Sequence, residues 1–342
     1  MKKVLLLVLV IASGQLFAQE NYNYNKFKQL KEELATPTVY RTASGAPGSQ
    51  YYQQKASYVI DLVLDDKNQK ITGKETITYK NNSPDQLEYL WIQLDQNVRA
   101  KDSDTKLVNS MIIGSKKSFA EIASLHNDFD GGFKLDYVKS SSGKDLKYTV
   151  NKTMMRIDLP TPLAAGASVS MKIGWWYNVN NRDISGGRSG YEYFEENDNY
   201  LYTIAQFYPR MAVYNETEGW QNKQFLGNGE FALPFGDFKV NITVPSDHIV
   251  GATGSLTNAS SVLTSTQRAR FQKAQTEYLK PVIIVTQAEV EEIEKKKTSG
   301  TKTWSYSATN VRDFAFASSR KFIWDAMAVK YNGNSTLAMS YY

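Results

Sequence analysis

Histidine and cysteine, the side chains that most often hold a hydrolytic zinc ion, are scarce in this 342-residue chain. It has no cysteine, and its two histidines are His126 and His248. A zinc hydrolase needs about three protein ligands, two of which are commonly supplied by a helical His-Glu-x-x-His motif. Neither histidine has a second histidine four residues away, so we interpret both as surface loop residues. We therefore expect no metal site and no catalytic residue in this chain.

Two polar loops have residue types that could support other chemistry. Residues 185–190 are rich in glycine and serine, but they neither follow a predicted strand nor open a predicted helix, as a phosphate-binding loop would. Glu192, Glu195, Glu196 and Asp198 crowd one segment and have the residue types of a glycoside hydrolase. Adjacent acids of one loop rarely flank a scissile bond, so a solvated acidic loop is the favoured interpretation.

The most distinctive polar segment spans residues 201–220 and contains Gln206, Tyr208 and Arg210. A strand is predicted to run into Gln206 and to break at Pro209, which has no backbone N–H to donate. The break would place an amide, a phenol and a guanidinium at a sheet edge, where they could bind the polar end of a substrate. A structural alternative remains open, in which tyrosine and proline form a corner and Arg210 pairs with an acid.

Alternation along the chain predicts the elements that must position this segment. In residues 57–65 every second side chain is apolar, residues 71–79 alternate in the same way, and a polar turn at 65–68 joins them into a hairpin. The fold class is therefore mainly β, a large antiparallel β-sandwich or saddle domain with few short helices. Helices are predicted at 21–34, 118–125 and 288–296. Further strands are predicted at 87–94, 133–138, 146–150, 154–159, 168–177, 200–205, 238–244, 269–273, 276–285, 303–307 and 313–317.

The ends of the chain and its charge indicate a compartment and a class of partner. Residues 1–18 begin with two lysines before a short apolar stretch and have the pattern of a secretory signal peptide. We expect a periplasmic or secreted protein without a membrane span after signal cleavage. The predicted organisation is an N-terminal extension and linker at 19–50, a β domain at 51–329, and the start of a truncated further domain at 330–342. The net charge of +5, or +3 without the signal, gives no electrostatic case for nucleic acid.

Over most of residues 57–342 the sequence is similar to the N-terminal domain of peptidase family M1, the aminopeptidase N and leukotriene-hydrolase superfamily, especially its secreted Bacteroidetes-type members. The resemblance rests on collinear runs, of which the most specific are ITGKETITYKN at 71–81 and AQFYPRMAVY at 205–214. Many members have a Phe-Pro-Cys-x-Asp-Glu-Pro segment after the glutamine that corresponds to Gln206, whereas this chain does not. Further matching runs lie at 219–220, 225–231, 235–240, 242–245, 250–254 and 310–317.

The resemblance implies a β domain that packs against a thermolysin-like catalytic domain in cis and helps close its active site. The parent enzyme would be a zinc-dependent aminopeptidase acting on a peptide substrate. In the family the zinc ligands, the catalytic glutamate and a Gly-x-Met-Glu-Asn segment lie further along the chain, so no zinc is expected here. The family's glutamine that approaches the first substrate side chain matches Gln206. Tyr208 and Arg210 lie beside it as further candidates for substrate binding.

A function of a different class remains open. A stand-alone exported β-sandwich could bind a glycan or a protein through exposed aromatic residues such as Trp175, Trp176 and Tyr177. Sheet cores also collect tryptophan, and burial is the interpretation that we favour for these three residues.

Overall fold

The computed structural model describes residues 37–105, 116, 118–119, 129–227, 229 and 232–342. The chain divides into two units, the first ending at Tyr51 and the second running from Tyr52 to Tyr342. In the first unit, Arg41 and Pro47 form an isolated β-bridge, and the Arg41 guanidinium lies 5.0 Å from the centre of the Tyr51 ring. The predicted signal peptide, the helix predicted at 21–34 and most of the helix predicted at 118–125 lie outside the described residues.

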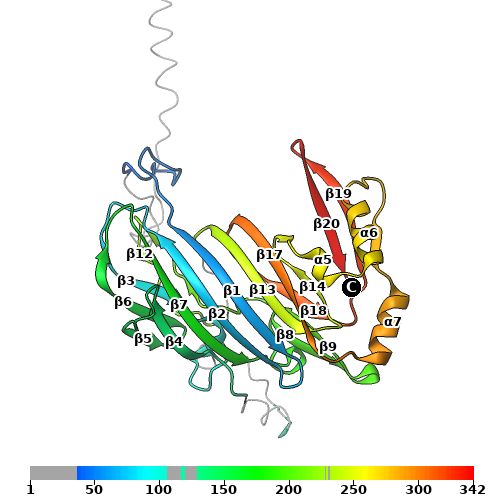
Figure 1. Ribbon diagram of the computed structural model, residues 1–342. Coiled ribbons are helices and arrows are strands. Elements are labelled where there is room, and N and C mark those ends of the chain that lie inside the picture. Colours follow the sequence, from blue (N-terminus) through cyan, green and yellow to red (C-terminus); the bar gives the residue numbers. More distant parts are fainter. Residues whose placement is uncertain (1–36, 106–115, 117, 120–128, 228, 230–231) are drawn as a thin grey trace, which may run out of the picture. The chain divides into compact units, whose positions relative to one another are not determined.

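A seven-stranded sheet is the largest sheet of the second unit (Figure 1). Its strand order is β15-β17-β13-β1-β2-β7-β4. β1 and β2 form the predicted hairpin, and the pairing of β1 with β13 is the one parallel pair among the described strands. These strands are β1 (Lys55–Asp65), β2 (Lys70–Lys80), β4 (Lys134–Ser140), β7 (Ser168–Asn178), β13 (Gly236–Pro245), β15 (Ser255–Leu256) and β17 (Thr301–Val311).

Four smaller antiparallel sheets complete the described part of the second unit. The first, β10-β3-β6-β5, contains β3 (Leu87–Gln93), β5 (Tyr148–Asn151), β6 (Met154–Leu163) and β10 (Arg210–Met211). The second, β14-β18-β9-β8, contains β8 (Gly190–Phe194), β9 (Asn199–Ile204), β14 (Ile249–Ala252) and β18 (Phe316–Ser319). The others are β11 (Tyr214–Asn215) with β12 (Gly219–Trp220), and β16 (Val282–Val285) with β19 (Trp324–Tyr331) and β20 (Asn334–Tyr341). The prediction of a mainly antiparallel β fold is confirmed.

The inner faces of these sheets contribute to one hydrophobic core. In β1 the alternate residues from Tyr58 to Leu64 are buried, whereas Val59 and Val63 on the other face are nearly half exposed, as the period of two predicts. Aromatic rings link the sheets, because Tyr79 of β2 stacks on Trp220 of β12 with 6.1 Å between ring centres. Burial of this single apolar face therefore defines the register of the strands.

Gly73 in β2 marks a close approach inside this core. An added Cβ at Gly73 would lie 2.5 Å from Cζ2 of the Trp175 indole, which belongs to the neighbouring strand β7. Trp175 is completely buried, and its Nε1 donates a hydrogen bond to the Phe207 carbonyl at 3.0 Å. The missing side chain at position 73 thus gives the indole the space from which it reaches the 206–210 segment.

The described helices are few and short, as predicted. α7 (Gln287–Lys296) coincides with the helix predicted at 288–296. The strand predicted at 269–273 is wrong, because these residues lie in α6 (Ser265–Ala274), which begins with a capping box between Thr264 and Gln267. No helix in the described ranges is long and apolar enough to cross a bilayer. The remaining helical segments are η2 (Asp95–Arg99), α4 (Arg182–Ser185), η3 (Glu195–Asn197) and α5 (Ala259–Val262).

β19 and β20 form a tight hairpin in the last described part of the chain. Its turn consists of Asn332 and Gly333, with φ angles of 47° and 78°, and two-residue turns with positive φ match the twist of the paired strands. Lys330 pairs with Ser335 inside this hairpin. The described residues therefore show no boundary at position 330, and the start of a further domain stays a prediction.

Glu75 is an acid on the buried face of β2. It is 3% exposed, and among the described residues neither carboxyl oxygen has a hydrogen-bond partner. Burial raises the pKa of Glu75 well above its ordinary value of 4.5. Between the two pKa values the folded protein holds a proton that the unfolded chain has released, so stability falls as the pH rises above 4.5.

The variant Glu75→Gln is expected to be more stable than the wild type at pH 8, with a much smaller difference at pH 4.5. The glutamine amide has nearly the same shape as the carboxylic acid and carries no charge at any pH. Each pH unit between 4.5 and the folded-state pKa of Glu75 costs the wild type about 1.4 kcal/mol of stability. Urea unfolding at both pH values measures the difference. Glu88→Gln, on an exposed residue of β3, is the matched control, and equal pH profiles for the two variants would contradict the assignment.

Candidate functional site

Residues 206–210 connect two different sheets. They leave β9 and enter β10, which pairs with β3. β9 ends at Ile204, so the strand stops before Gln206 rather than at Pro209 as predicted. Gln206 has a φ of 54°, a left-handed conformation that costs roughly 1–2 kcal/mol for a residue with a side chain. Local contacts must offset this cost.

Three buried side chains bind the backbone on either side of Gln206. Ser189 Oγ lies 3.1 Å from the Ala205 nitrogen, from which it accepts, and 3.2 Å from the Ala205 carbonyl oxygen. Gln96 Nε2 donates to the carbonyl oxygens of Ala205 and Gln206, at 3.3 and 3.0 Å. Trp175 Nε1 binds the next carbonyl, as described above. Three consecutive carbonyls are therefore fixed by side chains from separate parts of the chain.

Arg210 forms the charged centre of the segment. Its Nε and Nη2 lie 3.0 and 2.9 Å from Asp95 Oδ2, and its Nη1 lies 2.6 Å from Asp313 Oδ2. Arg210 is 5% exposed and Asp95 is 1% exposed. Burial alone would lower the pKa of the Arg210 guanidinium, but the carboxylates of Asp95 and Asp313 outweigh it and raise the pKa. The guanidinium is thus a fixed positive charge inside the protein.

Tyr208 joins the same cluster. Its hydroxyl donates to Asp313 Oδ1 at 2.8 Å, and its ring packs edge-on against Tyr58 with 5.2 Å between ring centres. Burial raises the pKa of Tyr208 well above its ordinary value, so the phenol stays protonated. This arrangement matches the structural alternative, in which Arg210 pairs with an acid. Direct substrate contact by Tyr208 or Arg210 stays a prediction that this geometry does not favour.

Gln206 differs from its two neighbours. Its backbone is fixed, but within the described residues no hydrogen bond from its side-chain amide is found. The residue is half-buried, so part of it reaches solvent. A free amide on a rigid turn can both donate and accept one hydrogen bond to a ligand. Gln206 thus differs from Tyr208 and Arg210, whose side chains are held by Asp95 and Asp313.

The partners of this segment were not found by reasoning from the sequence. Asp95 and Gln96 follow β3 directly, Ser189 lies in the glycine-rich loop, and Asp313 precedes β18. No motif spacing links these residues to Arg210, because long-range strand pairing brings them together. The polar run at the end of a predicted strand at 87–94 was the one available signal, since polar residues there would be expected to face a neighbouring element.

Of the two histidines, the structure describes His248. His126 lies outside the described residues. The prediction that His248 lies in a surface loop is wrong, because the side chain is completely buried and its Nδ1 lies 2.9 Å from Ser318 Oγ. Burial with the nearby Arg320 lowers the pKa of His248 to about 3. Its Nε2 lies 4.0 Å from Asp66, but Arg320 already occupies that carboxylate at 3.0 Å. Among the described residues no three histidine or acidic side chains converge on one point. Next to His248 the positive charge of the Arg320 guanidinium does not fit a zinc ion.

The other candidates also have structural partners. Glu192 pairs with Arg182 at 2.7 Å, and Asp198 pairs with Lys297 at 2.6 Å, so these acids belong to surface ion pairs. Trp175 and Tyr177, two of the aromatic residues considered for glycan or protein binding, are buried in the core. The burial that we favoured for them is therefore confirmed, whereas Trp176 is partly exposed.

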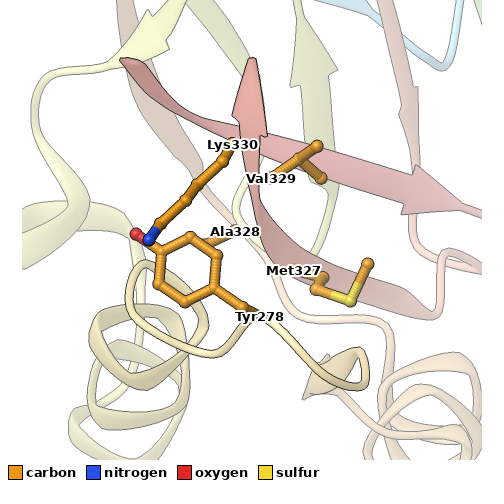
Figure 2. A pocket seen from close by; sticks show the side chains of 5 residues that line it. All are labelled: Tyr278, Met327, Ala328, Val329 and Lys330. Atoms are coloured by element: carbon orange, nitrogen blue, oxygen red, sulfur yellow. The ribbon is translucent and has the colours of Figure 1, made fainter. Parts of the chain in front are cut away.

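A pocket of about 380 Å³ lies beside β19 and is shown in Figure 2. It is lined by Tyr278 and by residues 327–330 of β19. The Lys330 ammonium lies 5.2 Å from the centre of the Tyr278 ring, and the Tyr278 hydroxyl lies 3.0 Å from Ser335 Oγ. Among the described residues no carboxylate or histidine lines this pocket, and the Tyr278 hydroxyl is already paired with Ser335.

Replacement of Arg210 by methionine is expected to destabilise the protein by about 3–5 kcal/mol, because Asp95 would then be buried without a counter-charge. Urea unfolding followed by tryptophan fluorescence gives the difference. Arg156→Met is the control, since Arg156 pairs with Asp158 on the surface and its loss should cost under about 1 kcal/mol. Equal effects of the two substitutions would contradict the charged centre.

Comparison with known proteins gives matches at the level of solved structures. No protein-family model matches the sequence, and no curated protein matches it. A variant of an M1 zinc metallopeptidase from Deinococcus radiodurans is 12% identical, with 86% of this chain and 48% of that chain covered and a TM-score of 0.43. The unmodified enzyme is 12% identical, over 84% and 47% of the two chains, with a TM-score of 0.43. A two-domain M1 zinc metallopeptidase variant bound to L-tryptophan is 11% identical, over 86% and 49%, with a TM-score of 0.44. The chain spans about half the length of these similar structures.

Proposed function

We propose that this chain is the non-catalytic N-terminal β domain of a longer, exported zinc-dependent aminopeptidase. The proposal rests first on the collinear sequence runs that resemble peptidase family M1. The structural observation that carries it is the state of Gln206, whose backbone is fixed on both sides and whose amide has no partner among the described residues. A binding residue on a rigid support of this kind loses little conformational entropy when a ligand arrives.

In this proposal the domain packs against a catalytic domain in cis and helps close the substrate site. Gln206 would present its amide to the first residue of a bound peptide. Tyr208 and Arg210 would act through their contacts with Asp313 and Asp95, which hold the segment in place, rather than by touching the substrate. Their predicted role in substrate binding is thereby narrowed to support of Gln206.

Hydrolysis would depend on polypeptide outside residues 1–342. In the family that the sequence resembles, the zinc ligands lie further along the chain, so the ligands of the zinc expected in the parent enzyme would come from the catalytic domain. When bound there, the metal would supply an activated water for attack on the peptide bond. The present domain would contribute orientation of the substrate and exclusion of water. The signal-like residues 1–18 support export to the periplasm or beyond the cell.

The stand-alone binding module is less well supported. A glycan platform needs aromatic rings that face solvent, but Trp175 and Tyr177 are buried. The Trp176 ring is covered by the Lys70 ammonium, which lies 3.8 Å from the ring centre. These contacts leave the predicted aromatic patch without a continuous exposed surface.

The proposal predicts that purified residues 19–342 hydrolyse no amino-acyl anilide, with or without added zinc. The product of the complete open reading frame should hydrolyse them, and a chelator should abolish that turnover, since its zinc ligands lie beyond Tyr342. Chelator-sensitive turnover by residues 19–342 alone would contradict the proposal that this domain is non-catalytic.

A second measurement needs no protein. The DNA downstream of the Tyr342 codon should encode a His-Glu-x-x-His motif and a Gly-x-Met-Glu-Asn motif. A stop codon directly after Tyr342 in an intact locus would overturn the aminopeptidase proposal and favour the binding module.

A further inference from the structure

We propose that Gln96 is a positioning residue that sets side-chain selectivity by holding the Gln206 peptide in its left-handed conformation. The inference rests on the function proposed above and extends it to a residue outside the predicted site. Gln96 lies in η2, which begins two residues after the end of β3, and it reaches Gln206 in the connection between β9 and β10.

The geometry of the Gln96 side chain fits this role. It is 2% exposed, and its Nε2 binds two successive carbonyl oxygens, those of Ala205 and Gln206. Its Oε1 accepts a hydrogen bond from Arg99 Nη1 at 3.2 Å. Because Arg99 can only donate and the carbonyls can only accept, these partners fix which end of the amide faces the turn. The side chain is therefore oriented as a donor toward Gln206.

The bond to Gln206 has no substitute within the described residues. Ser189 holds Ala205, and Trp175 holds Phe207, so both flank the left-handed residue without touching its carbonyl. Glutamine does not favour a positive φ by itself, so the direction of this peptide depends on the contact that it makes. Without Gln96 the 206 peptide could rotate, and the amide of Gln206 would point along several directions.

A rotated Gln206 would change recognition more than chemistry. In the proposed function the Gln206 amide meets the first residue of the peptide, so its direction affects which side chains fit. Gln96 itself is buried and touches no substrate. Its effect must therefore pass through Gln206, which is what separates a positioning role from a general role in folding.

The test uses the complete open reading frame and a series of amino-acyl anilides. Gln96→Glu keeps the length of the side chain and the acceptor for Arg99, but it turns an oxygen instead of a donor toward the two carbonyls. We expect kcat/KM for the preferred anilide to fall about tenfold, as for loss of a hydrogen bond, and the preference among anilides to flatten. In a Gln206→Ala background the same substitution should have no further effect.

The control is Gln267→Glu, on another buried glutamine. Gln267 accepts a hydrogen bond from the Thr264 backbone in the α6 capping box, a role that glutamate fills equally well, so activity and selectivity should not change. If Gln96→Glu does not fold, Gln96→Met replaces it. Methionine keeps the length of the side chain and loses both polar atoms, and it is tested in the same way, with and without Gln206→Ala.

The outcomes separate the two proposals. If the wild-type product shows no chelator-sensitive turnover, the aminopeptidase function itself is overturned. If turnover is present but Gln96→Glu keeps the wild-type preference, the positioning role is overturned. The role is also overturned if the substitution lowers kcat/KM equally with and without the Gln206 side chain, because that result is expected of a purely structural residue.

Discussion

The burial of one positive charge between two carboxylates organises the candidate site. Arg210 in β10 meets Asp95, which follows β3, and Asp313, which precedes β18. A buried ion costs several kcal/mol unless its partners arrive with good geometry, so none of these segments can take its place without the other two. The cluster therefore ties two separate sheets together at the turn that holds Gln206. Tyr208 strengthens the connection because its hydroxyl binds the same Asp313 carboxylate.

Much of the fold was predictable because it follows from burial of one face of each strand. The alternation in β1 and the helix-forming pattern in α7 are local, and both elements were found within a few residues. Residues 269–273, predicted as a strand, belong to a helix instead, because a capping box between Thr264 and Gln267 starts α6 just before them. The parallel pairing of β1 with β13 had no such signal, since residues far apart in the chain meet there.

The site was predictable in part, and the limit has a physical cause. The residue types of Gln206, Tyr208 and Arg210 single out a segment that the structure holds in place by contacts with distant residues. Whether a polar side chain faces a ligand or a buried partner depends on distant residues. No motif around Asp95 or Asp313 indicates that either residue pairs with Arg210. Backbone geometry was also hidden, because a left-handed glutamine has no sequence signature. The sequence therefore located the segment, but it did not separate the free amide from the two side chains that support it.

The contact between Gly73 in β2 and Trp175 in β7 couples the residue types that these two positions can accept. A relative with any side chain at position 73 would need a smaller residue than tryptophan at position 175. That exchange would remove the indole N–H from the Phe207 carbonyl and would loosen the turn next to Gln206. Among descendants of one ancestral gene, these two positions should therefore change together or not at all. The lack of a side chain at position 73 thus restricts, over evolutionary time, which substitutions are tolerated in a separate segment of the chain next to Gln206.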